Sequence, residues 1–256
     1  NKEYESINYV NPGFLNFTLT NKAWQNILHH IKNDLDNFGF QNLGQNKEVN
    51  IEYVSANPTG PVHIGHARGA VFGDVLAKLL SKNGFIVTKE YYVNDIGNQI
   101  TMLADTIELH IKNILNQTKK LPSNDMYKGE YLKKIADQLI KTKGSKILQN
   151  KEVLKTEVTK INLNSIKKDL KDLGINFDIF TSEKELHSKG IVNKILEILE
   201  KEGHLYWGYL DKPKGKIDEN WTAKKQYLFK STSFGDKVDR PIKKNDGTWT
   251  YFASDL

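Results

Sequence analysis

The chain has 256 residues, with 37 Lys and Arg against 31 Asp and Glu, and it contains no cysteine. These numbers allow one large or two modest domains and exclude disulfides, cysteine-ligated zinc and thiol catalysis. The formal charge of +6 comes almost entirely from lysine, so it permits a nucleic-acid partner without requiring one. No apolar run reaches the roughly 18 to 20 residues of a membrane-spanning helix. We therefore expect no membrane association and a cytoplasmic location.

The first residues carry the pattern of a small α+β unit. Alternating apolar residues predict a strand over 14–19, and a helical pattern follows over about 20–38. We interpret 1–46 as the end of a small N-terminal domain. We expect the chain to be an interval of a longer protein.

A strand–helix–strand–helix order follows. The sequence predicts strands over 49–55 and 85–93, a helix over 64–82, and a second helix with an apolar stripe from Ile100 to Ile114. This order is typical of a parallel α/β sheet. We therefore assign 47–117 to the first half of a Rossmann-like nucleotide-binding domain.

The remainder is lysine-rich and helical before it becomes β-rich. Helical patterns cover 130–148, 151–173 and 186–201. Period-two patterns then predict strands at 205–207, 227–229, 241–242 and 249–251, with Asp246-Gly247 as a hairpin turn. We assign 118–246 to a helical and β insertion, the connective region, and 247–256 to the start of the second catalytic half. The predicted fold class is thus α/β.

Two histidines stand where the first strand passes into a helix. His63, Gly65 and His66 follow a loop with two prolines and a glycine. At a helix start, free backbone N–H groups and the helix dipole attract phosphate, and imidazoles can donate to a transferring phosphoryl group. Gly65 lets a base or ribose lie against the backbone. A histidine pair that only caps the helix or binds a stray metal ion is the alternative.

Several stretches resemble the arginyl-tRNA synthetases, a family of class I aminoacyl-tRNA synthetases. Residues 52–69 read EYVSANPTGPVHIGHARG, which is close to the first signature of that family. Further similar stretches are YYVNDIGNQ (91–99), YKGEY (127–131), FKSTSFGD (229–236) and DGTWTYFASD (246–255). PGFLNF (12–17) is similar to the close of the family's N-terminal additional domain, so the resemblance implies that 1–46 is the end of this tRNA-binding domain.

The resemblance implies a role for each matching residue. It implies that ATP contacts the signature and that the substrate arginine lies beside it. The implied catalytic residues are His63, Gly65 and His66, and Thr59 joins them in binding ATP. The implied arginine-binding residues are Glu52, Ser55, Ala56, Asn57, His63, Tyr251 and Asp255. A solvated strand residue is the alternative for Glu52, and a core aromatic is the alternative for Tyr251.

Other expectations are less specific. Asp95, Gly97 and Gln99 follow the second strand and could contact the amino acid. We expect Arg68 and Asp74 to serve packing or ion pairing. The implied substrates are arginine, ATP with Mg²⁺, and tRNA(Arg), acted on by a monomer, with no metal bound by protein side chains and no organic cofactor.

The second lysine signature of class I synthetases is not found in its usual place. Lys143-Gly144-Ser145-Lys146 is similar, but it lies in the predicted insertion, and we interpret it as coincidence. We expect the true loop and the anticodon-binding domain beyond Leu256. Two other functions remain open, namely a histidine-signature nucleotidyltransferase with another substrate and a non-catalytic tRNA-binding relative.

Overall fold

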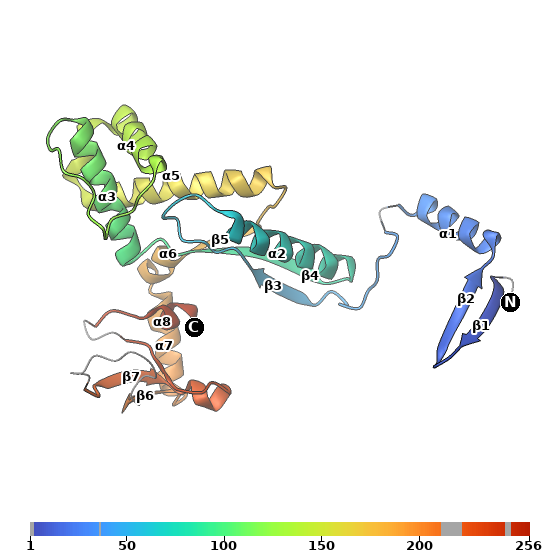
Figure 1. Ribbon diagram of the computed structural model, residues 1–256. Helices are drawn as coiled ribbons and strands as arrows, with labels where there is room; N and C mark the ends of the chain where they lie inside the picture. Colours follow the sequence, from blue (N-terminus) through green and yellow to red (C-terminus); the bar gives the residue numbers. More distant parts are fainter. Residues whose placement is uncertain (1–2, 36, 211–221, 244–246) are drawn as a thin grey trace.

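The N-terminal part is a two-stranded hairpin followed by one helix (Figure 1). The computed structural model describes residues 3–35, 37–210, 222–243 and 247–256. Strands β1 (Tyr4–Val10) and β2 (Phe14–Leu19) pair antiparallel, and α1 (Asn21–Asn33) follows. The strand predicted over 14–19 is confirmed, whereas β1 was not predicted.

The helix predicted over 20–38 is shorter in the structure, because its ends are fixed by capping. The Thr20 hydroxyl accepts a hydrogen bond from the backbone N–H of Ala23 at 3.2 Å, so Thr20 stands just outside α1. Asp34 ends the helix, and turns follow it. In Figure 1 the hairpin and α1 lie apart from the rest of the chain, joined to it by an extended segment.

A three-stranded parallel sheet forms the centre of the molecule. Its strands are β3 (Glu48–Glu52), β4 (Ile86–Val93) and β5 (Ile179–Ser182), in the order β3-β4-β5. Helix α2 (Ile64–Lys82) connects β3 to β4, with the bounds that the sequence predicts. The predicted α/β class with a parallel sheet is therefore confirmed.

Strand β5 was not predicted from the sequence. It is only four residues long and lies inside 118–246, the interval assigned to the insertion. Its residues pair with Glu90–Val93 of β4, so the sheet continues within that interval. A strand this short carries too few alternations to be recognised by period.

The strand predicted over 49–55 ends three residues early. Val54 and Ser55 adopt φ angles of 66° and 38°, in the left-handed region that β-branched residues in particular avoid. The chain therefore leaves the sheet after Glu52 and turns into the loop that precedes α2. Backbone conformations of this kind tend to gather at functional sites.

One face of the sheet is covered by α2 and by the second half of α5 (Lys151–Asp172). The side chains that alternate toward this face of β4 pack against both helices. The buried members of this cluster are Tyr53, Ala70, Tyr91, Val93, Ile166, Leu170 and Ile175. This cluster fixes the start of α2 relative to the strand ends.

The first half of α5 belongs to a second core. It packs with α3 (Asn98–Ile114), α4 (Glu130–Lys143) and a 3-10 turn η1 (Gly144–Gln149) in a helical bundle. The helix predicted over 130–148 ends at Lys143, because Gly144 adopts a φ of 65°. Helix α5 thus joins the bundle to the sheet.

The C-terminal part contains α6 (Glu183–Ser188), α7 (Ile191–Lys201) and a small antiparallel sheet. The sheet has the strands β6 (Leu205–Tyr209), β7 (Lys225–Phe229) and β8 (Arg240–Pro241), with the 3-10 turn η2 (Ser231–Phe234) between the last two. Short helix α8 (Tyr251–Asp255) ends the chain in Figure 1.

Two predictions for this part need correction. The helix predicted over 186–201 is two helices, because Gly190 is left-handed with a φ of 67°. The strand predicted over 249–251 is wrong, since Trp249 makes only an isolated bridge to Lys243, and Tyr251 opens α8. The predicted turn residue Asp246 lies outside the described residues.

Within the described ranges, every helix is too short or too polar to cross a bilayer.

Candidate active site

The two signature histidines form the start of α2 by bonding to its backbone. His63 is the N-cap residue, and its Nδ1 accepts a hydrogen bond from the N–H of Gly65 at 3.1 Å. His66 Nδ1 accepts from the N–H of His63 at 3.2 Å. The two rings stack with centroids 3.8 Å apart. This is a reciprocal cap of the kind that Ser and Glu form at other helix starts.

These bonds determine which nitrogen carries the proton. A neutral imidazole has one N–H donor and one bare acceptor nitrogen. Since Nδ1 accepts in both His63 and His66, both protons lie on Nε2. Partial burial, together with the neighbouring His63, lowers the pKa of His66 below its ordinary value. The pair therefore offers two Nε2–H donors at the positive end of a helix.

Gly65 leaves room for the His63 ring beside the helix start. A Cβ atom at this position would lie 2.9 Å from Cε1 of His63, which is closer than side chains approach. The space that the sequence assigned to a base or ribose at this point is thus bordered by the His63 ring. A side chain on residue 65 would push that ring off its backbone bond.

The loop before α2 is held to the neighbouring strand. The Tyr91 hydroxyl of β4 donates to the carbonyl of Ala56 at 2.7 Å, and the N–H of Tyr92 donates to the Ser55 hydroxyl at 3.0 Å. Burial raises the pKa of Tyr91, which keeps its hydroxyl a donor. Two of the predicted arginine-binding residues therefore contact β4 through groups that also fix the loop.

Asn57 and Gln99 meet across the two loops. The Asn57 amide nitrogen donates to the Gln99 side-chain oxygen at 2.6 Å. This bond turns the Asn57 amide so that its oxygen stays available as an acceptor, the polarity that an α-amino group needs. Two residues predicted from different motifs are thus brought together at the carboxyl ends of β3 and β4.

Glu52 and Thr59 are less closely tied to this meeting point. Glu52 is the exposed last residue of β3, in register with Glu90 of β4. Thr59 lies in a tight turn in which its N–H donates to the carbonyl of Asn57 at 2.7 Å.

Asp95 bonds to a different part of the molecule. One carboxylate oxygen accepts from the Ser182 hydroxyl at 2.6 Å, and the other accepts from the N–H of Lys184 at 2.8 Å. Asp95 thereby ties the end of β4 to the junction of β5 and α6. Gly97 adopts a φ of 93° and precedes α3, whose start has no side-chain cap.

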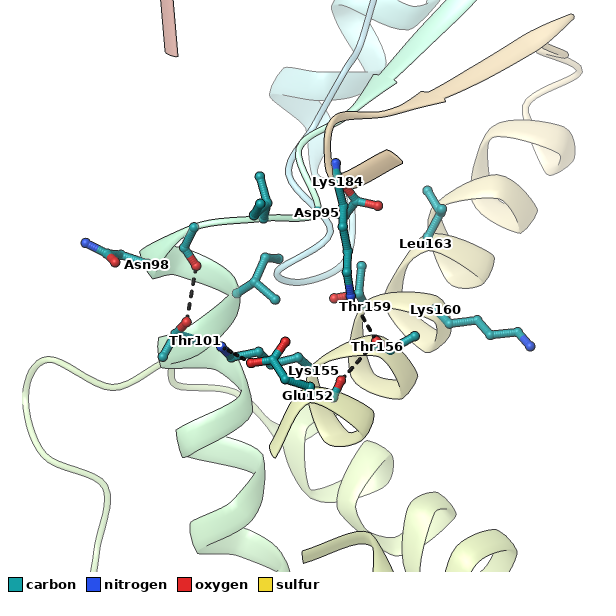
Figure 2. A pocket seen from close by; sticks show the side chains of 13 residues that line it. Asp95, Asn98, Thr101, Glu152, Lys155, Thr156, Thr159, Lys160, Leu163 and Lys184 are labelled. Carbon is teal, nitrogen blue, oxygen red and sulfur yellow. Dashed lines mark hydrogen bonds and ion pairs between the residues drawn. The ribbon is translucent and has the colours of Figure 1, made fainter. Parts of the chain in front are cut away.

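A cavity of about 460 Å³ lies beside this junction. Figure 2 shows lining side chains that come from the start of α3 and from one face of α5. Lys184 extends along the cavity, and its ammonium group donates to the Thr156 hydroxyl at 3.3 Å. Lys155 pairs with Glu152 at 2.8 Å. Lys184, Lys155 and Glu152 therefore bond to other residues that line the cavity.

A larger cavity, of about 560 Å³, adjoins α8. Gly97 lines it together with residues that sequence reasoning missed, among them His187 and Ser254, whose Nε2 and hydroxyl lie 3.0 Å apart. Ser254 stands in a family-like stretch, whereas no motif marked His187.

The backbone of α8 places Tyr251 and Asp255 one helical turn apart, as their spacing predicts. The side chains of both residues lie outside the described residues, and their roles stay predictions.

Asp74 and Arg68 lie on α2, outside the histidine pair. Asp74 is buried and pairs with Lys78 at 2.6 Å, as predicted, and Arg68 is exposed. Over the described ranges, no three His, Asp or Glu side chains gather as a metal site. The prediction that protein side chains hold no metal stays a prediction.

A parallel α/β sheet whose first strand leads into an imidazole-capped helix defines the histidine-signature class of nucleotide-binding enzymes. Comparison with known proteins narrows this class. The chain belongs to the family described as tRNA synthetases class I (R), catalytic domain, whose model matches residues 26–256. The resemblance inferred from the sequence is thus confirmed, and this family uses ATP as a substrate.

Individual relatives agree with this assignment. An arginine–tRNA ligase from Wolbachia pipientis wMel is 48% identical over 256 residues, which cover 99% of this chain and 45% of that protein. A crystal structure from Campylobacter jejuni assigned as an arginyl-tRNA synthetase is similar with a TM-score of 0.76 at 32% identity, over 93% of this chain and 49% of that one. The Thermus thermophilus arginyl-tRNA synthetase shares the fold, with a TM-score of 0.57 at 19% identity over 100% of this chain and 41% of that one. The chain thus spans about half the length of the relatives it matches.

Proposed function

We propose that the complete protein activates arginine with ATP and transfers it to tRNA(Arg). The observation that carries this proposal is the capped start of α2, where His63 and His66 bond to the backbone through Nδ1 and expose two Nε2–H donors. Donors fixed before the substrate arrives stabilise developing charge without reorganisation. The family match supports arginine as the amino acid.

In the proposed reaction the arginine carboxylate attacks the α-phosphorus of ATP, and pyrophosphate leaves with Mg²⁺. The bond from the α-phosphorus to the bridging oxygen breaks as the mixed anhydride forms. The terminal ribose hydroxyl of the tRNA then attacks the carbonyl carbon, and AMP leaves. No covalent bond to the protein is needed, so catalysis depends on position and charge.

The chain's own residues divide this work. His63, His66 and the N–H groups at the start of α2 bind the phosphates, with Thr59 and Gly65 beside them. Asn57, oriented by Gln99, accepts a hydrogen bond from the α-amino group of arginine. Ser55, Ala56 and Glu52 line the same strand end, and Tyr251 and Asp255 bind the guanidinium as the family resemblance implies.

We propose that 1–46, 47–117, 118–246 and 247–256 are separate functional regions of the chain. Strand β5, which lies in 118–246, belongs to the catalytic sheet. A monomeric, cytoplasmic enzyme is the expected form, and light scattering of the complete protein measures its mass.

The direct test is ATP–pyrophosphate exchange and aminoacylation of total tRNA by the complete gene product, with each amino acid in turn. We expect labelled pyrophosphate to be incorporated into ATP when arginine is present and not with any other amino acid. The exchange should be measured both with and without tRNA. Exchange with a different substrate would indicate another histidine-signature nucleotidyltransferase. Binding of tRNA without any turnover would indicate a non-catalytic relative.

A further inference from the structure

The stretch Tyr127-Lys128-Gly129-Glu130-Tyr131 has no part in the site described so far. Tyr131 lies in the first turn of α4, in the helical bundle. Its hydroxyl donates a hydrogen bond of 2.9 Å to the carbonyl of Thr59, which lies 72 residues earlier in the chain. Thr59 stands between Asn57 and His63. The bundle is therefore attached directly to the loop that carries the proposed ligand groups.

Glycines make room for the Tyr131 ring on two sides. At Gly60, a Cβ atom would lie 3.1 Å from the Tyr131 hydroxyl and 3.2 Å from its Cζ. At Gly129, which has a φ of 141°, a Cβ atom would lie 2.7 Å from Cε1 of the ring. Both the loop and the helix start thus have glycine where the ring approaches them. The contact is therefore encoded at three positions of the chain.

Tyr131 has a counterpart on the other side of the loop. Tyr91, fully buried on β4, holds the carbonyl of Ala56 in the same way at 2.7 Å. Two tyrosine hydroxyls, one from the sheet and one from the bundle, thus hold the carbonyls of residues 56 and 59. Asn57 lies between these two anchors and is also held by Gln99. The chain that continues to His63 follows the second anchor, so its position depends on Tyr131.

The ring itself is well supported. It is half-buried against the bundle core, and burial, with Tyr127 nearby, raises the pKa of the Tyr131 hydroxyl. Tyr127 packs on the same core, and the hydrogen bonds described for residues 3–210 include none from its hydroxyl to the loop. Of the two tyrosines in this motif, Tyr131 bonds to the loop through its hydroxyl, and substitution by phenylalanine removes that bond while keeping the ring.

The geometry points to Tyr131 as a positioning residue that holds the loop from Thr59 to His63 in place for the step in which ATP reacts. This inference rests on the proposed function, because it concerns the same signature loop. Tyr131 does not touch the reacting atoms and acts through the Thr59 carbonyl.

The test compares Tyr131→Phe with Tyr127→Phe in the complete gene product. In arginine-dependent exchange, Tyr131→Phe should lower kcat/KM for ATP about three- to tenfold, the range expected for one lost hydrogen bond. Because Asn57 keeps its own contacts, the KM for arginine should stay within about twofold of the wild-type value. Tyr127→Phe should match the wild type.

A second variant tests the same contact from the loop side. Gly60 has no unusual backbone angle, so Gly60→Ala should act through the Tyr131 ring alone and reproduce the loss. In the double variant Gly60→Ala, Tyr131→Phe, the loss in kcat/KM for ATP should be smaller than the product of the two single losses, because both substitutions disturb one contact. Wild-type kinetics for Tyr131→Phe with only a lower unfolding temperature would overturn the inference, as would an equal loss for Tyr127→Phe.

Hydrogen exchange separates this inference from the proposed function. If the wild-type protein shows no arginine-dependent exchange of pyrophosphate, the proposed function fails, and the loop can still be measured. Amides of residues 57–66 should then exchange faster in Tyr131→Phe than in Tyr127→Phe. Equal exchange in the two variants would overturn the positioning role.

Discussion

The first two strand-to-helix junctions of the parallel sheet, β3–α2 and β4–α3, have the same topology, but their side chains bond in different ways. At the β3–α2 junction, His63 and His66 bond to the helix start through Nδ1, which leaves the Nε2 of each ring to carry the proton. At the β4–α3 junction, the helix start has no side-chain cap, and Asp95 bonds to the β5–α6 junction. In the proposed function the first junction binds the ligand, whereas the bonds of Asp95 at the second hold neighbouring elements together. Position at the carboxyl edge of a sheet therefore does not by itself assign a ligand-binding role.

The largest expected effect comes from removing one donor at the first junction. His66→Ala deletes a preorganised N–H group and one half of the cap, so exchange should fall about 100-fold in kcat. Since His66 contacts phosphate in this account, the KM for arginine should change little. Steady-state kinetics of the complete protein measure both values. Unchanged kcat would remove His66 from the phosphate site.

A smaller effect at the same junction tests the ring geometry. Gly65→Ala places a Cβ atom against the His63 ring and should lower kcat about tenfold by displacing that donor. Gly69→Ala is the matched control on the same helix, because a Cβ atom there meets no other atom within 4 Å. Equal rates for the two variants would contradict the requirement for glycine at residue 65.

The smallest kinetic effect is expected at the second junction. Asp95→Ala removes two hydrogen-bond acceptor sites and should lower the free energy of unfolding by about 1–3 kcal/mol. Urea denaturation measures this change. Asp95→Asn keeps one acceptor oxygen, so it should lose less stability than Asp95→Ala. The KM for arginine should stay near the wild-type value in the variants that fold. A steep rise in that KM for Asp95→Asn, at wild-type stability, would instead place Asp95 at the amino acid.

The sequence predicted the structure of the first junction better than that of the second. The bounds of α2 followed from its apolar spacing and its end at Asn83-Gly84, which are local signals. The bonds of Asp95 were not predictable, because their partners Ser182 and Lys184 lie 87 and 89 residues away. They stand at the junction of α6 with β5, a strand that the sequence did not reveal. Likewise, the left-handed Val54 ends β3 against the local β-propensity of its neighbours.

The site shows the same limit. The sequence predicts Asn57 and Gln99 as ligand-binding candidates from two separate motifs. Only the fold shows that they bond to each other. The role of Tyr131 depends on a contact 72 residues away, which no spacing rule contains. His187 has no sequence signal at all, because a single histidine in a helical stretch is common.

The central claim is that the signature histidines are held through Nδ1 and present Nε2–H donors. Nitrogen-15 NMR of the imidazoles in the complete protein tests it directly. At pH 7.5 both rings should have a protonated Nε2 and a bare Nδ1. The pKa of His66 should lie below its ordinary value of 6.5, because partial burial and the neighbouring His63 disfavour the charged ring. Protonation of Nδ1 would also break its bond to the His63 N–H. The cap should therefore be intact above pH 6.5 and weaken as the pH falls through the lowered pKa. An Nδ1–H tautomer in either ring, or a raised pKa for His66, would contradict the account.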